Sequence, residues 1–148
     1  MYVEWLTDSY LIESTIRHPK IYPYVSDNTC PKPEEFNWPN SDDFFSVGCF
    51  ENEYMGCFCF HEKSSSEVEI HTCLLPIARG KSLQFGQLVI RFILENTPYL
   101  VISTFVPKTN KLAKRLALKC GFEIDGKGDK FNGEYTDRLV FLRGQKCQ

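Results

Sequence analysis

The sequence lacks several features that would assign it to a special class of protein. Among its 148 residues, no apolar run reaches the roughly 18 residues of a membrane-spanning helix, and no repeat or low-complexity tract occurs. The N-terminus carries no basic stretch followed by an apolar region, the pattern of a secretory signal. We therefore expect a cytoplasmic protein without a membrane partner.

The cysteines also lack a pattern. There are seven, an odd number, with no C-x-x-C pair and no histidine at metal-ligand spacing, so we expect no metal site. Five of them lie in apolar or strand-like stretches, where a free thiol behaves as a small buried apolar group. These five are Cys49, Cys57, Cys59, Cys73 and Cys120.

What the sequence does contain indicates one compact domain over residues 1–148. Hydrophobic residues make up 43% of the chain, and 12 Phe, 7 Tyr and 2 Trp supply large apolar side chains. This content excludes a disordered chain, and the length fits one domain of about 150 residues.

Charge is distributed unevenly along the chain, although the net charge is only −2. Residues 1–78 hold 4 Lys/Arg against 13 Asp/Glu, and residues 79–148 hold 13 against 6. A basic half can bind nucleic acid or a phosphorylated small molecule. Because the basic residues are spread over several expected elements and no nucleic-acid motif occurs, we expect no nucleic-acid partner.

The periodicity of apolar residues predicts an α/β protein with a mixed sheet. After a first strand, Asp8 or Ser9 caps a helix that ends before His18-Pro19, and residues 19–42 form a long irregular segment. The other expected elements are a hairpin (44–50 and 54–61), a strand (67–75), a helix from 82 to 96 capped by Ser82, a strand (99–106), a helix capped by Thr109 and ended by Gly121, and strands at 122–131 and 138–142.

The stretch LLPIARGKSLQFG at residues 74–86 is the most informative part of the chain. A strand that runs through a polar loop into a helix exposes unpaired backbone N–H groups and the positive end of the helix dipole. Arg79 and Lys81 add two cations there, and the combination suits a phosphate. The alternative is an ordinary strand-to-helix turn with two solvated cations.

The same residues carry a family resemblance. Pro76 to Gln84 resembles the P-x-x-R-G-x-G-x-G/A pyrophosphate loop of the GNAT acyltransferase superfamily, and Asn110-x-x-Ala113 followed by Gly121-Phe122 resembles its N-x-x-A…G-F signature. The resemblance covers residues 44–143. It implies a GNAT-like α/β fold: a mixed, mostly antiparallel sheet flanked by helices, with two splayed central parallel strands.

The resemblance also implies a function, the transfer of an acetyl group from acetyl-coenzyme A to an amine by direct attack. The acceptor would be a small-molecule or protein amine. The cofactor would be held by main-chain groups beside the pantetheine arm, by the pyrophosphate loop, and by an asparagine across from the arm. The implied positions are Leu74, Leu75, Arg79, Gly80, Lys81, Ser82, Leu83, Gln84 and Asn110.

The sequence departs from the family pattern at four positions. Ser82 and Gln84 stand where the loop has glycines, and a Cβ there makes close approach to a phosphate harder. Ala117 stands where many members have a tyrosine that protonates the leaving thiolate, and Phe105 where some have a glutamate base.

The remaining candidates for proton transfer lie on one face of the strand at 67–75. There Glu69 and His71 alternate with apolar residues and could face an acceptor cleft, with His71 taking a proton from the ammonium. The alternative is a solvated sheet edge or a polar pair. His18 could lie across the cleft, or it could simply complement the dipole at its helix end. Tyr135 could replace the absent acid, although no spacing singles it out.

A second, looser resemblance extends over nearly the whole chain. The segments RHPKIYPYVSDN and VEIHTCLLPIARG resemble small GNAT-like proteins of tailed bacteriophages, some of which are associated with virion or head assembly. This resemblance implies an alternative role as a non-catalytic interaction or assembly module with virion proteins as partners. It also implies a location in the host cytoplasm.

Overall fold

The computed structural model describes residues 1–144, and Cys147 lies outside that range. The strands are β1 (Tyr2–Leu6), β2 (Phe44–Glu51), β3 (Glu53–Glu62), β4 (Glu67–Leu74), β5 (Val101–Pro107), β6 (Glu123–Phe131) and β7 (Glu134–Leu142). The helices are α1 (Ser9–Ile16), α2 (Tyr22–Val25), α3 (Ser82–Asn96) and α4 (Lys111–Lys119), with short 3₁₀ turns η1 (Pro33–Glu35) and η2 (Pro76–Ala78).

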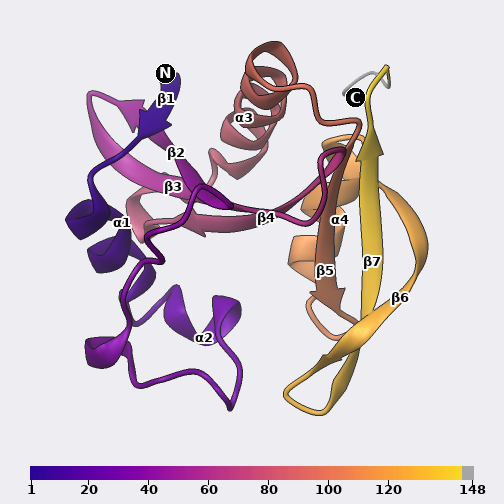
Figure 1. Cartoon of the computed structure of the whole chain (residues 1–148), viewed down its shortest axis with the longest axis horizontal. Helices are drawn as coiled ribbons and strands as arrows, with labels where there is room; N and C mark the ends of the chain where they lie inside the picture. Colours follow the sequence, from indigo (N-terminus) through magenta and orange to yellow (C-terminus); the bar gives the residue numbers. More distant parts are fainter. Residues whose placement is uncertain (145–148) are drawn as a thin grey trace.

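The strands form one mixed sheet in the order β1-β2-β3-β4-β5-β7-β6 (Figure 1). Neighbouring strands are antiparallel except β4 and β5, which run parallel. This parallel pair spans only three residue pairs, from Glu67 opposite Val101 to Glu69 opposite Ser103. Beyond Glu69 the two strands separate, so the sheet is split at its centre, as the fold prediction requires.

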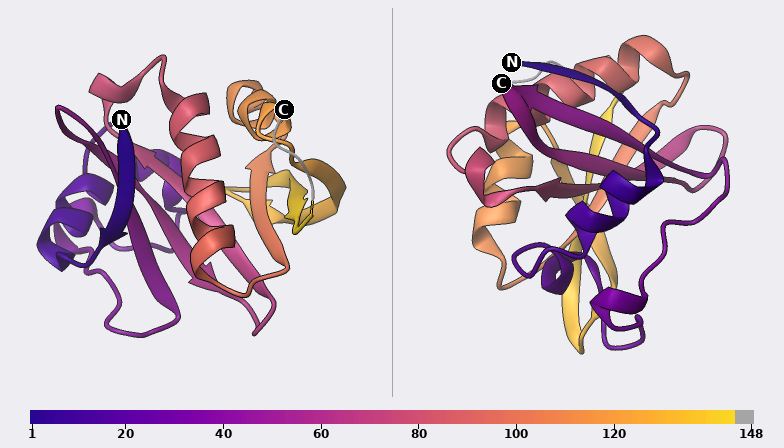
Figure 2. Two further views of the ribbon diagram at one scale, coloured as in Figure 1. Left: turned by 90° about the horizontal axis from the view of Figure 1, so that it is seen from above. Right: turned by 90° about the vertical axis from the view of Figure 1, so that its left-hand side faces the viewer.

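Helices cover both faces of the sheet (Figure 2). The apolar side of α3 packs with Val68, Ile70 and Ile102 in the main core, and α4 packs against the same core. On the opposite face, α1 and the segment after it cover the thiols of Cys57, Cys59 and Cys73. Side chains alternate between the two faces along each strand, so neighbouring residues of β3 and β4 contribute to different cores. The five cysteines expected to be buried are buried.

The segment at 19–42 is more structured than its prolines predict. It contains α2 and η1, and Ile21 and Tyr22 are buried against the sheet. Arg17 donates to the carbonyl of Phe36, and Glu13 accepts from the amide of Trp38 at 2.9 Å. These contacts hold the segment over β3 and over β4, which is one of the two strands that border the split.

Two predicted helix caps are wrong. Ser82 is the first residue of α3 rather than its cap, because Lys81 takes the cap position without a side-chain hydrogen bond. Asn110, not Thr109, caps α4, and its Oδ1 accepts from the Ala113 amide at 3.2 Å. The α1 cap is Asp8, one of the two predicted residues. Strand ends also differ: β5 begins at Val101, and β7 begins at Glu134, four residues before the expected start.

Candidate functional site

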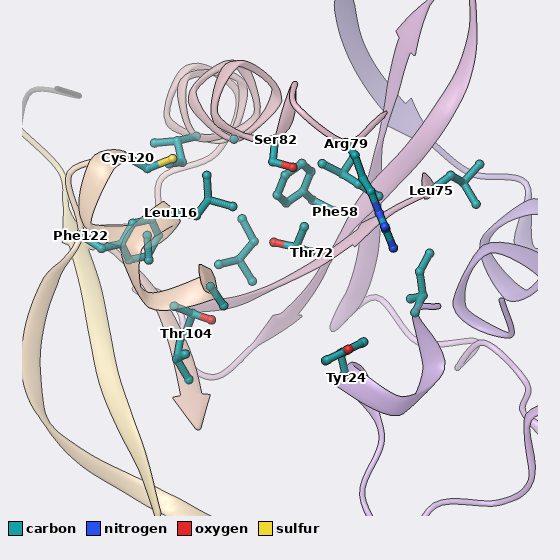
Figure 3. A pocket seen from close by; sticks show the side chains of 18 of the residues that line it. Tyr24, Phe58, Thr72, Leu75, Arg79, Ser82, Thr104, Leu116, Cys120 and Phe122 are labelled. Atoms are coloured by element: carbon teal, nitrogen blue, oxygen red, sulfur yellow. The ribbon is translucent and has the colours of Figure 1, made fainter. Parts of the chain in front are cut away.

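The split between β4 and β5 opens into a cavity of about 280 Å³, which we call the splay cavity (Figure 3). Its walls come from β4 and β5, from one side of α3 and from one side of α4, while residues before and in α2 close it from the other face of the sheet. Its lining residues include Lys20, Tyr24, Thr72, Leu74, Leu75, Arg79, Ser82, Gly86, Ala113, Leu116 and Ala117. The cavity therefore reaches from one face of the sheet to the other.

The loop between β4 and α3 forms one end of the splay cavity. Gly80 has φ +87°, and open space surrounds the position of a Cβ there. The amides of Ser82, Leu83 and Gln84, at the start of α3, have no hydrogen-bond partner within residues 1–144. Unpaired amides at a helix start, together with the helix dipole, attract an anion.

The two cations of this loop differ in their surroundings. Arg79 is exposed, borders the splay cavity and makes no ion pair within the described chain. The Nζ of Lys81 instead lies 2.6 Å from Oε2 of Glu51, at the end of β2. Its hydrogen bond lowers the pKa of the Glu51 carboxyl. Arg79 is therefore the loop cation that an anion in the cavity meets without competition from a carboxylate.

The side chains at the two positions where the GNAT pyrophosphate loop has glycines do not fill the cavity. Ser82 lies on its wall, whereas Gln84 is exposed and is not among the lining residues. At the opposite wall, Ala113 and Ala117 of α4 present only methyl groups, so the cavity is mostly apolar between its two ends. Leu74 and Leu75 also line it, but Asn110 does not, because its side chain caps α4.

A second pocket, of about 220 Å³, lies where β4 and β5 separate, and we call it the carboxylate pocket. It contains Glu69 and His71 from β4 together with Lys63, and Phe105 faces them from β5. Tyr24 lines this pocket and the splay cavity, so the two adjoin. The structure therefore brings the two proposed proton-transfer residues to the apex of the split.

Glu69 is the most buried charged group of the carboxylate pocket, with 8% of its surface exposed. Its carboxylate lies 3.0 Å from the Lys63 Nζ and 3.3 Å from the His71 Nε2. Burial works to raise the pKa of Glu69, but the hydrogen bonds and charges of His71 and Lys63 outweigh it and hold the pKa at about 2. At neutral pH the group is a carboxylate that fixes the imidazole, and it is too weak a base to take a proton from an ammonium.

The other two candidates lie elsewhere. His18 follows α1, and its Nδ1 accepts from the Lys20 amide at 3.0 Å. Tyr135 is exposed on β7, where the Lys130 ammonium lies 4.7 Å from the centre of its ring. Neither residue lines the splay cavity or the carboxylate pocket.

Sequence reasoning missed Tyr24 and the methyl wall of α4. Tyr24 lies in the segment expected to be irregular, and it reaches the junction of the two pockets because its neighbours Ile21 and Tyr22 are buried against the sheet. Ala113 and Ala117 were recognisable as one face of an expected helix, since they recur at a spacing of four residues. That this face borders a cavity depends on how α4 packs against the split sheet.

Comparison with solved structures identifies the fold, whereas no family model and no curated relative matches the sequence. The aminoglycoside acetyltransferase AAC(6')-Ib, solved with coenzyme A and kanamycin, superposes with a TM-score of 0.73 at 15% identity, covering 96% of this chain and 94% of that one.

Two other acetyltransferases are similar. The spermidine N-acetyltransferase SpeG of Vibrio cholerae gives a TM-score of 0.74 at 13% identity over 96% of this chain and 95% of that one. The N-acetyltransferase PseH of Campylobacter jejuni, solved with acetyl coenzyme A, gives 0.58 at 18% identity over 70% and 71%. The architecture of this chain is therefore the GNAT fold.

Proposed function

We propose that the protein is an N-acetyltransferase that transfers an acetyl group from acetyl-coenzyme A to an amine, within one domain spanning residues 1–148. One observation carries the proposal: the splay cavity joins unpaired amides at the start of α3 to the pocket that holds Glu69 and His71. Solved structures of the same fold contain coenzyme A or acetyl coenzyme A, which supports this choice of donor.

The residues of the cavity fit the parts of coenzyme A. The free amides of Ser82, Leu83 and Gln84 suit the diphosphate, and Arg79 adds a positive charge beside them. Leu74 and Leu75 line the path from this end to the apex. Gly80 and Lys81 belong to the same loop, with Lys81 held by Glu51. Asn110, expected beside the pantetheine arm, is not placed in this site, because its side chain caps α4 and its amide donates to the Pro107 carbonyl at 2.9 Å.

The chemistry that the bound donor supplies is an acetyl thioester, whose carbonyl carbon an amine can attack directly. Attack requires a neutral amine, so the ammonium must first lose a proton. The Nε2 of His71 faces the Glu69 carboxylate, and we propose that this nitrogen carries the imidazole proton while Nδ1 accepts the proton of the amine. Glu69 then acts as a positioning residue. Orientation in the cavity supplies much of the remaining rate, without a side-chain acid.

The first experiment is calorimetric titration with acetyl-coenzyme A. We expect binding at micromolar concentrations, and Arg79→Ala weakens it about tenfold because a charge-assisted contact contributes about 1.5 kcal/mol. Arg91→Ala is the matched control, since Arg91 is an exposed arginine of α3 that does not line the cavity. The absence of any heat of binding at millimolar acetyl-coenzyme A would contradict the proposal.

The second experiment measures release of free thiol with a panel of amines. His71→Gln should lower kcat far more than it changes the affinity for acetyl-coenzyme A, because His71 lies outside the splay cavity. If kcat of His71→Gln depends on pH in the same way as kcat of the unmodified protein, another group accepts the proton.

The second candidate function is a non-catalytic interaction or assembly module, such as a virion component encoded by a bacteriophage. One observation favours it. Beside the split, Ala117 has a methyl group at the position where many GNAT enzymes have a tyrosine acid, and Phe105 has a phenyl ring where some have a glutamate base. This function predicts no acetyl transfer to any amine of the panel. For either function we propose a cytoplasmic location, where the six free thiols of residues 1–144 stay reduced, and this is the host cytoplasm if a phage encodes the protein.

A further inference from the structure

A third cavity lies on the face of the sheet covered by α1 and α2, and the proposed function leaves it without a role. Its volume is about 170 Å³, and we call it the aromatic pocket. Rings of Tyr22, Phe36, Trp38 and Phe44 surround it, and Cys59 and Cys73 lie on the strand side. Every lining residue is uncharged apart from two histidines, His61 and His71, that can take up a proton.

The aromatic pocket adjoins the carboxylate pocket. His71 and Val25 line both, so the imidazole that faces Glu69 also faces the apolar space. Along β4 the next side chain on this face is Cys73, two residues further on, which corresponds to about 6.6 Å at the rise of a strand. A bound molecule whose nitrogen lies at His71 would therefore place an apolar group beside Cys73 if two or three bonds separate that nitrogen from the apolar group.

The size and lining of the pocket select the apolar group. A dry apolar cavity of about 150 Å³ is large enough to hold benzene, so 170 Å³ accommodates one six-membered aromatic ring. Tyr22 and Phe36 meet at 65° with centroids 6.1 Å apart, and Trp38 and Phe44 meet at 79° and 6.0 Å. Such edge-to-face pairs offer ring edges and faces to a further ring. A flexible polycation would leave its charges in this pocket without a carboxylate.

We infer that the aromatic pocket binds the ring of the acceptor, and that the acceptor is an aralkyl primary amine whose nitrogen lies about two carbons from the ring. This inference rests on the proposed function for the meaning of "acceptor". Binding of the amine itself depends only on the two adjoining pockets. The ring enters the space beneath Trp38, while the amine nitrogen remains beside His71, whose Nε2 faces the Glu69 carboxylate that Lys63 also contacts.

Trp38 provides a direct reporter of binding, because the sequence contains only one other tryptophan, Trp5. In Trp5→Phe protein, 2-phenylethylamine is titrated without acetyl-coenzyme A and Trp38 fluorescence is recorded. We expect a saturable change, and binding of n-butylamine and of spermidine at least tenfold weaker. The absence of a saturable change with 2-phenylethylamine, or equal binding of the three amines, overturns the inference.

Val25→Phe tests the location, because Val25 lies between the two pockets and a larger side chain occupies the space of the ring. We expect at least tenfold weaker binding of 2-phenylethylamine. The matched control is Glu34→Phe, which places the same side chain at an exposed position of η1 outside the aromatic pocket. Unchanged binding in Val25→Phe overturns the inference, and the Trp5→Phe titration decides the matter even if Val25→Phe does not fold.

The two proposals fail separately. Loss of the proposed function is read from acetyl-coenzyme A calorimetry, which does not involve Trp38. Loss of the inference is read from Trp38 fluorescence, which does not involve the donor. Where both hold, kcat/KM for 2-phenylethylamine exceeds that for n-butylamine at least tenfold.

Discussion

The buried carboxylate of Glu69 should make the stability of the protein depend on pH in a way that one substitution removes. The pKa of this group falls from an ordinary value of 4.5 to about 2 in the folded protein. A depressed carboxyl pKa stabilises the folded state fully above pH 4.5, and the contribution is lost as the pH falls toward 2. The difference of about 2.5 pKa units corresponds to about 3 kcal/mol at 1.36 kcal/mol per unit.

Glu69→Gln removes the titrating group and keeps the shape of the side chain. We expect the variant to be up to about 3 kcal/mol less stable than the unmodified protein at pH 7, because Lys63 and His71 lose a buried partner. The gap should stay constant down to about pH 5 and close as the pH approaches 2. Urea denaturation at a series of pH values, followed by circular dichroism, measures it.

Glu4→Gln is the control for this experiment, since Glu4 is exposed on β1 and makes no ion pair within the described chain. It should follow the unmodified protein at every pH. A gap below about 1 kcal/mol at pH 7, or a gap that persists unchanged to pH 3, would refute the account of Glu69 as a carboxylate held by Lys63 and His71.

Three further substitutions test other parts of the structure. Glu51→Gln releases Lys81, so calorimetry should show acetyl-coenzyme A binding about threefold tighter at low salt but unchanged at high salt. The control Glu53→Gln, in the same turn, should leave the affinity unchanged at both salt concentrations. Ala117→Tyr places a phenol on the wall of the splay cavity and should raise kcat about tenfold in the thiol-release assay; an unchanged kcat would show that thiolate protonation does not limit the rate. Gly56→Ala should lower the free energy of unfolding, measured by urea denaturation, by more than about 3 kcal/mol, because φ is +116° and the Cβ would lie 2.6 Å from the Cys73 carbonyl oxygen. Gly80→Ala should lower it by only about 1 kcal/mol, because open space surrounds that position.

Much of the fold could be predicted because local patterns decide it. The hairpin of β2 and β3, the strand β4 and the long helix α3 follow from alternation, helical periodicity and turn residues, each within a short window of sequence. The caps were harder, since neighbouring polar residues compete for one position. Asn110 rather than Thr109 satisfies the α4 amide, and Lys81 precedes α3 without any side-chain cap.

The site could be predicted only in part, because the contacts that form it join segments far apart in the sequence. The loop at 76–84 and the pair Glu69 and His71 stand out locally. That Glu51 holds Lys81 depends on an ion pair across 30 positions of sequence. The aromatic pocket depends in the same way on the packing of residues 22–38 over β3 and β4. The amino-acid composition indicates neither the Glu51–Lys81 ion pair nor the aromatic pocket.

The short parallel junction between β4 and β5 has a consequence for how the chain folds. On one side of it, β2, β3 and β4 are consecutive strands, and on the other side β6 and β7 form a hairpin, so both parts can form from contacts close in sequence. The junction joins strands separated by all of α3 and contributes only three residue pairs. Contacts of such wide sequence separation are slow to form. The junction should therefore close late in folding, and the split that shapes the splay cavity then arises in the last assembly step.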